Sequence, residues 1–171
     1  TVEEHSPMSY IEVKASRAIF GDTEFAIRLP NAVHGIFTVA AIYFTIGLLY
    51  NWTAGFSAGL LLALNPYAMG LSREGRMYNE WLLFTILAIL VGVTAVRRGR
   101  AIPDNQVTWH WIVLGLMLMM THAATPHAQP TILGVALWLL LVSLHDLVRR
   151  PKMGLRLIEG SLMAGLTYLF S

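Results

Sequence analysis

The stretch "NAVHGIFTVAAIYFTIGLLY", residues 31–50, is long and apolar enough to cross a membrane as one helix. A spanning α-helix needs about 20 mostly apolar residues. After Asn51, the stretch "WTAGFSAGLLLALNPYAMGL", residues 52–71, is a second run of the same kind. Runs of this length are too long for β-strands, so they predict membrane helices joined at Asn51.

Four more apolar runs follow, at residues 77–96, 107–126, 131–148 and 157–170. Of the 171 residues, 56% are hydrophobic and 13% are charged, whereas soluble domains carry about 25% charged residues. We therefore predict an all-α, polytopic membrane protein with about five to six transmembrane helices. Residues 1–171 form a single membrane domain, with an outer-side loop and interfacial helix over residues 1–30 and transmembrane helices over residues 31–171.

Composition also excludes several functions. The chain has no cysteine, so it has neither a disulfide nor a thiolate metal site. Its net charge is only +2, and it lacks a basic tract with interleaved aromatic residues, so nucleic acid is not an expected partner. The chain begins at Thr1 and ends within the apolar run "LMAGLTYLFS". We expect a piece of a longer protein, and the alternative is a short, processed subunit.

Basic residues near helix ends predict the side of the membrane on which each loop lies. Two basic loops, residues 97–106 and 149–156, are separated by two apolar runs and are placed in the cytoplasm. Residues 1–28, 70–77 and 122–130 are then outside. Basic residues there run against the charge rule, so they either bind an anion or extend to lipid headgroups. They are Lys14, Arg17, Arg28, Arg73 and Arg76.

Residues 7–20 predict a helix that lies in the membrane interface. Apolar residues recur in it at spacings of three and four: Met8, Ile11, Ala15, Ala18 and Ile19. Gly21 is expected to end this helix, and Thr23 to cap the next one. Pro30 is expected to open the first span, because a helix does not need its missing N–H in the first turn.

Three outer-side clusters could carry chemistry. In the first, "VEEHSP", Glu3 and Glu4 stand beside His5. A carboxylate near a membrane surface can act as a general base or hold a divalent metal. The alternative is a solvated, charged loop.

The second cluster contains Arg73 and Arg76, which are three residues apart and share one face of a helix. Two guanidinium groups in that arrangement form a receptor for phosphate or pyrophosphate. Glu80, four residues after Arg76, could steady its guanidinium group. The alternative is a surface network of ion pairs. In the third cluster, His122 and His127 have a spacing that suits a metal pair poorly. His110 and His122, twelve residues apart, could instead face haem or chlorophyll, which one buried histidine can ligate.

Taken in order, these clusters resemble the early part of the polytopic glycosyltransferases of the GT-C superfamily. That group includes protein O-mannosyltransferases and bacterial lipid A aminoarabinose transferase. "EEHSP" is similar to the family's acidic residue, His or Lys and Pro-Pro-Leu that precede an interfacial helix. "FGDTEFAIRLPNAVHG", residues 20–35, resembles its FG-(D/N)-(S/T)-E-x-x-x-R-L-P segment. "NPYAMGLSREGRMY" and "MMTHAATPHA" resemble its later P–S-x-E-A-R-M-Y and Y-T-H-Y segments.

The resemblance implies a transferase that takes a sugar from a polyprenyl-phosphate donor on the outer face of the membrane, here expected to be the bacterial inner membrane. The family's leading catalytic Asp would lie upstream of Thr1, so Glu3 and Glu4 are expected to be supporting carboxylates. Ser6 replaces the first proline of the family's Pro-Pro pair. The residues expected to bind the lipid phosphate are His5, Arg73, Arg76 and Tyr78.

A function of a different class is the alternative. The chain could be a non-catalytic subunit, derived from this superfamily, of a larger membrane complex beside pigment or haem. A transporter is disfavoured, because ionisable residues other than His34 lie near the predicted helix ends. The expected partners are the lipid-linked sugar and membrane lipids, joined in the alternative by other membrane subunits.

Overall fold

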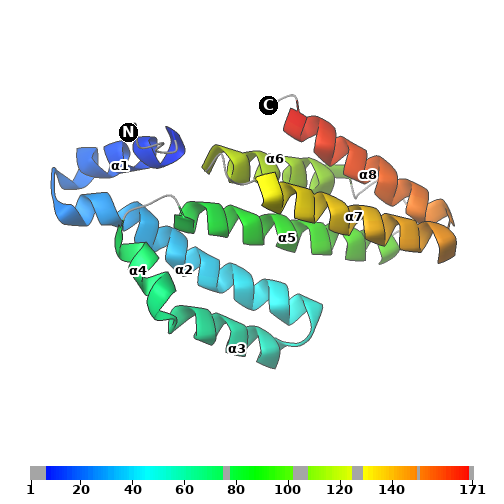
Figure 1. The fold of residues 1–171 in the computed structure, drawn as a ribbon, viewed down its shortest axis with the longest axis horizontal. Coiled ribbons are helices and arrows are strands. Elements are labelled where there is room, and N and C mark those ends of the chain that lie inside the picture. The colour runs from blue at the N-terminus through cyan, green and yellow to red at the C-terminus, as the bar shows by residue number, and fades with distance from the viewer. Residues whose placement is uncertain (1–6, 75–77, 102–107, 125–128, 150, 170–171) are drawn as a thin grey trace.

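The computed structural model describes residues 7–74, 78–101, 108–124, 129–149 and 151–169. Within these ranges the secondary structure is entirely helical, which confirms the all-α prediction (Figure 1). The helices are α1 Pro7–Phe20, α2 Glu24–Leu49, α3 Trp52–Ala63, α4 Pro66–Glu74, α5 Tyr78–Ala101, α6 Thr108–Ala124, α7 Gln129–Arg149 and α8 Pro151–Leu169.

The polytopic membrane architecture is also confirmed. In the described part of the chain, α2, α5 as far as Arg97, and α7 are long and apolar enough to cross a membrane. The bent pair of α3 and α4 makes a fourth candidate span. The predicted five to six spans also included α6 and α8, but α6 is an apolar helix of only 17 residues.

The connection between α1 and α2 forms largely as predicted. Gly21 ends α1 with a φ of 75°, a left-handed conformation that glycine adopts without steric cost. Thr23 caps α2, because its side-chain oxygen accepts a hydrogen bond of 3.2 Å from the Ala26 N–H. The prediction for Pro30 was wrong: α2 begins at Glu24, and Pro30 lies inside it. The Thr23 cap starts the helix before the proline is reached.

The prediction of one continuous helix over residues 52–71 was also wrong. The chain bends by 57° between α3 and α4. Pro66 has no N–H with which to continue the hydrogen-bond ladder of α3, and its ring opposes continuation. The Asn65 side chain instead accepts a hydrogen bond of 2.9 Å from the Tyr67 N–H and so starts α4.

The basic residues predicted in cytoplasmic loops belong to helices wherever the structure describes them. Arg97, Arg98 and Arg100 lie in the last turns of α5, while Lys152 and Arg156 lie in the first turns of α8. Figure 1 shows that the ends of α5 and α7 that carry basic residues lie at one end of the molecule. The opposite end of the molecule holds the helix ends that adjoin the predicted outer loops. These are the start of α2 and the ends of α4 and α6.

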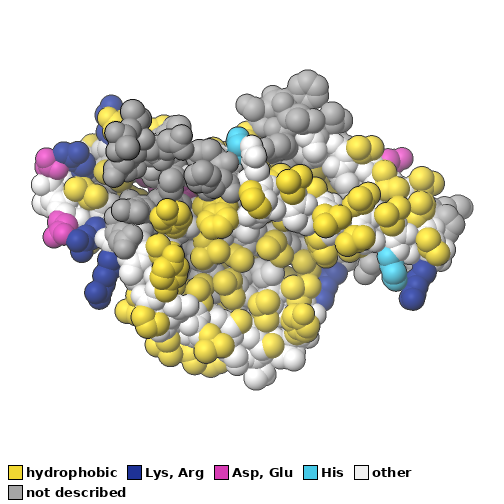
Figure 2. Space-filling model, in the orientation of Figure 1, with side chains coloured by type: hydrophobic (Ala, Val, Ile, Leu, Met, Phe, Trp, Pro, Cys, Tyr) yellow, Lys and Arg dark blue, Asp and Glu magenta, His cyan; other side chains and the backbone are white. Residues whose placement is uncertain are grey.

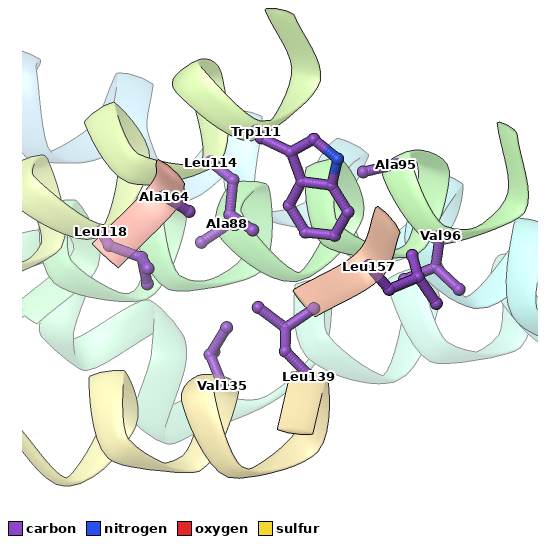
Figure 3. Packing of buried hydrophobic residues seen from close by; sticks show 10 residues of the cluster. All are labelled: Ala88, Ala95, Val96, Trp111, Leu114, Leu118, Val135, Leu139, Leu157 and Ala164. Carbon is purple, nitrogen blue, oxygen red and sulfur yellow. The ribbon is translucent and has the colours of Figure 1, made fainter. Parts of the chain in front are cut away.

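The main hydrophobic core lies among α5, α6, α7 and α8 (Figure 3). Trp111, Leu114 and Leu118 of α6 pack there against Ala88 of α5 and Leu139 of α7. A second group of helices forms where α2 packs against α3, α4 and α5. Figure 2 shows hydrophobic side chains across the middle of the visible face and charged side chains mainly toward its ends, as a membrane protein requires.

Candidate functional site

A cavity of about 440 Å³ lies where α2, the bent pair α3–α4 and α5 meet. Most of its wall is apolar, and it is formed by Ala32, Ile36, Val39, Leu62, Ala63, Ala68, Met69 and Leu82. The helix break creates this space, because α4 turns away from the direction of α3 and leaves α2 partly uncovered. The cavity can therefore hold an apolar chain.

Two arginines give the cavity a charged boundary. Arg28, in the second turn of α2, and Arg73, near the end of α4, both line it. The Arg28 guanidinium forms an exposed ion pair with Glu24, one turn earlier in α2. Arg73 is exposed and is paired with no acid among the described residues. Guanidinium groups beside an apolar wall suit a ligand with an anionic head and an apolar tail.

A buried polar network forms the wall beside these arginines. The Asn31 amide donates a hydrogen bond of 2.7 Å to the Leu71 carbonyl of α4. The Asn79 amide of α5 donates hydrogen bonds of 2.8 Å to the Ser72 hydroxyl and 3.3 Å to the Asn31 carbonyl. Ser72 in turn donates to the Ala68 carbonyl at 3.0 Å. The network joins α2, α4 and α5.

A second polar cluster lies beneath α1. Glu12 of α1 approaches His34 of α2, with 3.4 Å between its Oε1 and the histidine Nε2. Glu80, in the first turn of α5, is in electrostatic range of both residues. Its side chain is only 1% exposed, and neither carboxylate oxygen has a hydrogen-bond partner among the described residues. Sequence reasoning expected Glu80 to steady Arg76, with a surface network of ion pairs as the alternative, and the burial of Glu80 contradicts that alternative.

Helix α1 turns two of its polar residues, Glu12 and Ser16, away from solvent. Ser16 is buried and Glu12 is half-buried, whereas the apolar residues Ile11 and Ile19 are 65% and 74% exposed. The apolar face predicted for contact with the bilayer is therefore free of other helices. The interfacial position of α1 itself stays a prediction.

The predicted site residues are only partly brought together. Arg73 lines the cavity, whereas Tyr78 begins α5, is 40% exposed, and does not line it. His122 lies exposed in the last turn of α6, also outside the cavity wall. The remaining predicted residues lie outside the described part of the chain, so their positions stay predictions; they are Glu3, Glu4, His5 and Arg76.

Sequence reasoning gave no role to Asn31, Ser72 or Asn79. A partial signal was present, because Asn31 follows Arg28 by three residues and so shares its helix face. The pairing of Asn79 with α2 and α4 had no local signal. For a divalent metal, no group of three or more His, Asp or Glu side chains suitable for binding occurs among the described residues.

Comparison with known proteins identifies relatives over nearly the whole chain. Residues 4–168 match the family model of dolichyl-phosphate-mannose-protein mannosyltransferases. The chain is 26% identical to "Putative mannosyltransferase YycA" of Bacillus subtilis (strain 168) over 149 residues, which are 87% of this chain. It is 28% identical to "Putative mannosyltransferase YkcB" of the same organism over 96 residues, or 56% of this chain.

These matches cover a small part of the relatives. The aligned regions span 21% of the first relative and 13% of the second. No solved structure matches the chain significantly.

Proposed function

The chain belongs to the dolichyl-phosphate-mannose-protein mannosyltransferase family, and from this premise we propose that it is part of an enzyme that transfers a sugar from a polyprenyl-phosphate donor. The acceptor is on the outer face of the membrane. In a bacterial cell this is the periplasmic face of the inner membrane. The chain supplies the membrane region that holds the donor.

The cavity between α2, α3–α4 and α5 carries this proposal. Its apolar wall matches the isoprenoid chain of the donor, and Arg28 and Arg73 match the phosphate. A charged group at a membrane boundary is retained when a ligand offsets its cost. Arg76 and His5 are proposed to complete the phosphate site.

In the proposed reaction, a hydroxyl of the acceptor attacks the anomeric carbon of the sugar with inversion. The bond between that carbon and the phosphate oxygen breaks, and the polyprenyl phosphate leaves with the bonding electrons. An outer-loop carboxylate takes the hydroxyl proton, with Glu3 and Glu4 in supporting roles. The arginines stabilise the negative charge that develops on the departing phosphate, because fixed charges directed at a developing anion lower the barrier.

The proposal is tested with the full-length protein in lipid nanodiscs. Farnesyl phosphate serves as the probe, and farnesol serves as its uncharged counterpart. We expect Arg73→Ala to weaken farnesyl phosphate binding by about tenfold or more, because the variant loses a charge-assisted hydrogen bond to the phosphate. Arg73→Lys should recover only part of the affinity, because lysine lacks the forked geometry. Arg76→Ala should behave like Arg73→Ala.

Arg17→Ala is the matched control. Arg17 is a similarly exposed arginine on α1, paired with Asp22 at 2.5 Å, and does not line the cavity. Its replacement should leave binding unchanged. Equal binding of farnesyl phosphate and farnesol by the wild type, or equal binding by wild type and Arg73→Ala, would refute the proposed site.

A further inference from the structure

Helix α4 carries Arg73 but has few apolar contacts to hold it in place. It follows the 57° bend, is nine residues long, and exposes Tyr67 and Met69 by 75% and 47%. A Cβ added at Gly70 would meet nothing within 4 Å. Apolar packing alone therefore fixes the position of α4 only weakly. Other interactions must hold α4, and with it Arg73, in place.

The polar network supplies that order at the residues next to the arginines. Asn31 lies on the same face of α2 as Arg28, three residues away, and binds the backbone of α4 at Leu71. Asn79 binds Ser72, the residue before Arg73. One set of hydrogen bonds thus fixes the backbone beside both guanidinium groups.

The two asparagines of the network are buried, and its Asn79 and Ser72 donors are satisfied within the protein. Asn31 and Asn79 are 6% and 4% exposed. The Asn79 amide gives its two N–H groups to Ser72 and to the Asn31 carbonyl, and Ser72 gives its hydroxyl proton to Ala68. These donors are therefore already used within the protein, which points to a positioning role rather than contact with a ligand.

The approach of α4 to α2 also depends on the absence of a side chain. A Cβ at Gly35 would lie 2.9 Å from the Ser72 hydroxyl oxygen and 3.4 Å from the Asn79 amide nitrogen. A methyl group there would push Ser72 away from Asn79. Gly35 thus leaves room for the network at the cavity wall.

We propose that Asn79 is a positioning residue that holds α4 against α2 and so sets the separation of Arg28 and Arg73 at the phosphate end of the cavity. The effect on binding of a lipid phosphate rests on the proposed function. The position of α4 can be measured independently of any ligand.

The first experiment measures that position. Spin labels are placed at Phe37→Cys on α2 and Tyr67→Cys on α4, both exposed positions in a chain that has no native cysteine. We expect a single, narrow distance distribution in the otherwise wild-type protein. Asn79→Leu, which fills a similar volume without the amide, should broaden or shift it. An unchanged distribution would overturn the inference.

The second experiment is a double-variant cycle with farnesyl phosphate in nanodiscs. Asn79→Leu and Arg73→Ala should each weaken binding by about tenfold, and the double variant should bind no more weakly than Arg73→Ala, because both changes remove the same contact. Asn79→Gln, which restores an amide, should recover part of the affinity. A purely structural defect would instead give additive losses.

Asn51→Ala is the matched control. Asn51 caps α3, accepting a 2.8 Å hydrogen bond from the Ala54 N–H, and lies away from the cavity wall. Its loss should cost stability but not affinity. Absence of probe binding by the wild type would refute the proposed function while the spin-label distances still decide the position of α4. Additive losses in the cycle would overturn the inference while leaving the proposed function intact.

Discussion

At the scale of single residues, the buried carboxyl group of Glu80 is costly to the fold. It is 1% exposed, and its two carboxylate oxygens have no hydrogen-bond partner there. His34 offers nearby positive charge when protonated, but Glu12 adds negative charge. Burial of a carboxyl group without a hydrogen-bond partner destabilises a fold.

We therefore expect Glu80→Leu to raise the free energy of unfolding by about 1–3 kcal/mol, the cost of a buried unsatisfied polar group. Glu80→Gln should gain less, because its amide group keeps polar atoms that need partners. Thermal unfolding of both variants in the same detergent measures the difference. If Glu80→Leu is less stable than Glu80→Gln, the carboxyl group has a stabilising partner and the argument fails.

At the scale of helices, α2 and α3 approach until their backbones touch. A Cβ at Gly55 would lie 2.5 Å from the Tyr43 carbonyl oxygen and 2.9 Å from the Gly47 nitrogen. Backbone cannot move aside as a flexible side chain can. Small residues permit such close helix pairs, which in lipid are held by van der Waals packing rather than by the hydrophobic effect.

Gly55→Ala should consequently destabilise the protein by about 1–3 kcal/mol, the usual cost of overpacking. Gly70→Ala is its control in a neighbouring helix, because nothing lies within 4 Å of a Cβ there. That change should stabilise the protein by up to about 1 kcal/mol through helix propensity. Thermal unfolding in nanodiscs compares the two variants, and a loss of equal size in both would contradict the backbone contact.

At the scale of the whole molecule, the helix ends that flank the predicted outer and cytoplasmic loops lie toward opposite ends of the molecule. The start of α2 and the end of α6 lie toward one end, and the end of α7 lies at the other (Figure 1). We expect residues 1–28, 70–77 and 122–130 to be outside and the basic ends of α5 and α7 to face the cytoplasm.

Cysteine labelling in intact cells tests this topology, because the chain has no native cysteine. Asp22→Cys and Ala123→Cys should react with a membrane-impermeant maleimide, and Arg149→Cys should react only after permeabilisation. All three positions are exposed. Reaction of Ala123→Cys and Arg149→Cys from the same side would reject the topology.

The sequence by itself determined the helical membrane class and several helix boundaries. Apolar runs of membrane length leave the backbone no alternative to helix in lipid, and the roles of Gly21 and Thr23 follow from local backbone chemistry. Arg73, which lines the cavity, was also singled out from the sequence, because its predicted place on the outer side runs against the charge rule. Each of these inferences depends on residues close together in the chain.

Only the tertiary structure decided the direction of α4 after the helix break and the residues that pack around it. Pro66 and Asn65 were visible in the sequence, but length and apolarity over residues 52–71 outweighed them in the prediction. The hydrogen bond from Asn79 to Asn31, across 48 positions, and the burial of Glu80 depend on how the helices pack together. A hydrogen bond between distant segments has no local pattern, because its partners meet only after the helices have assembled.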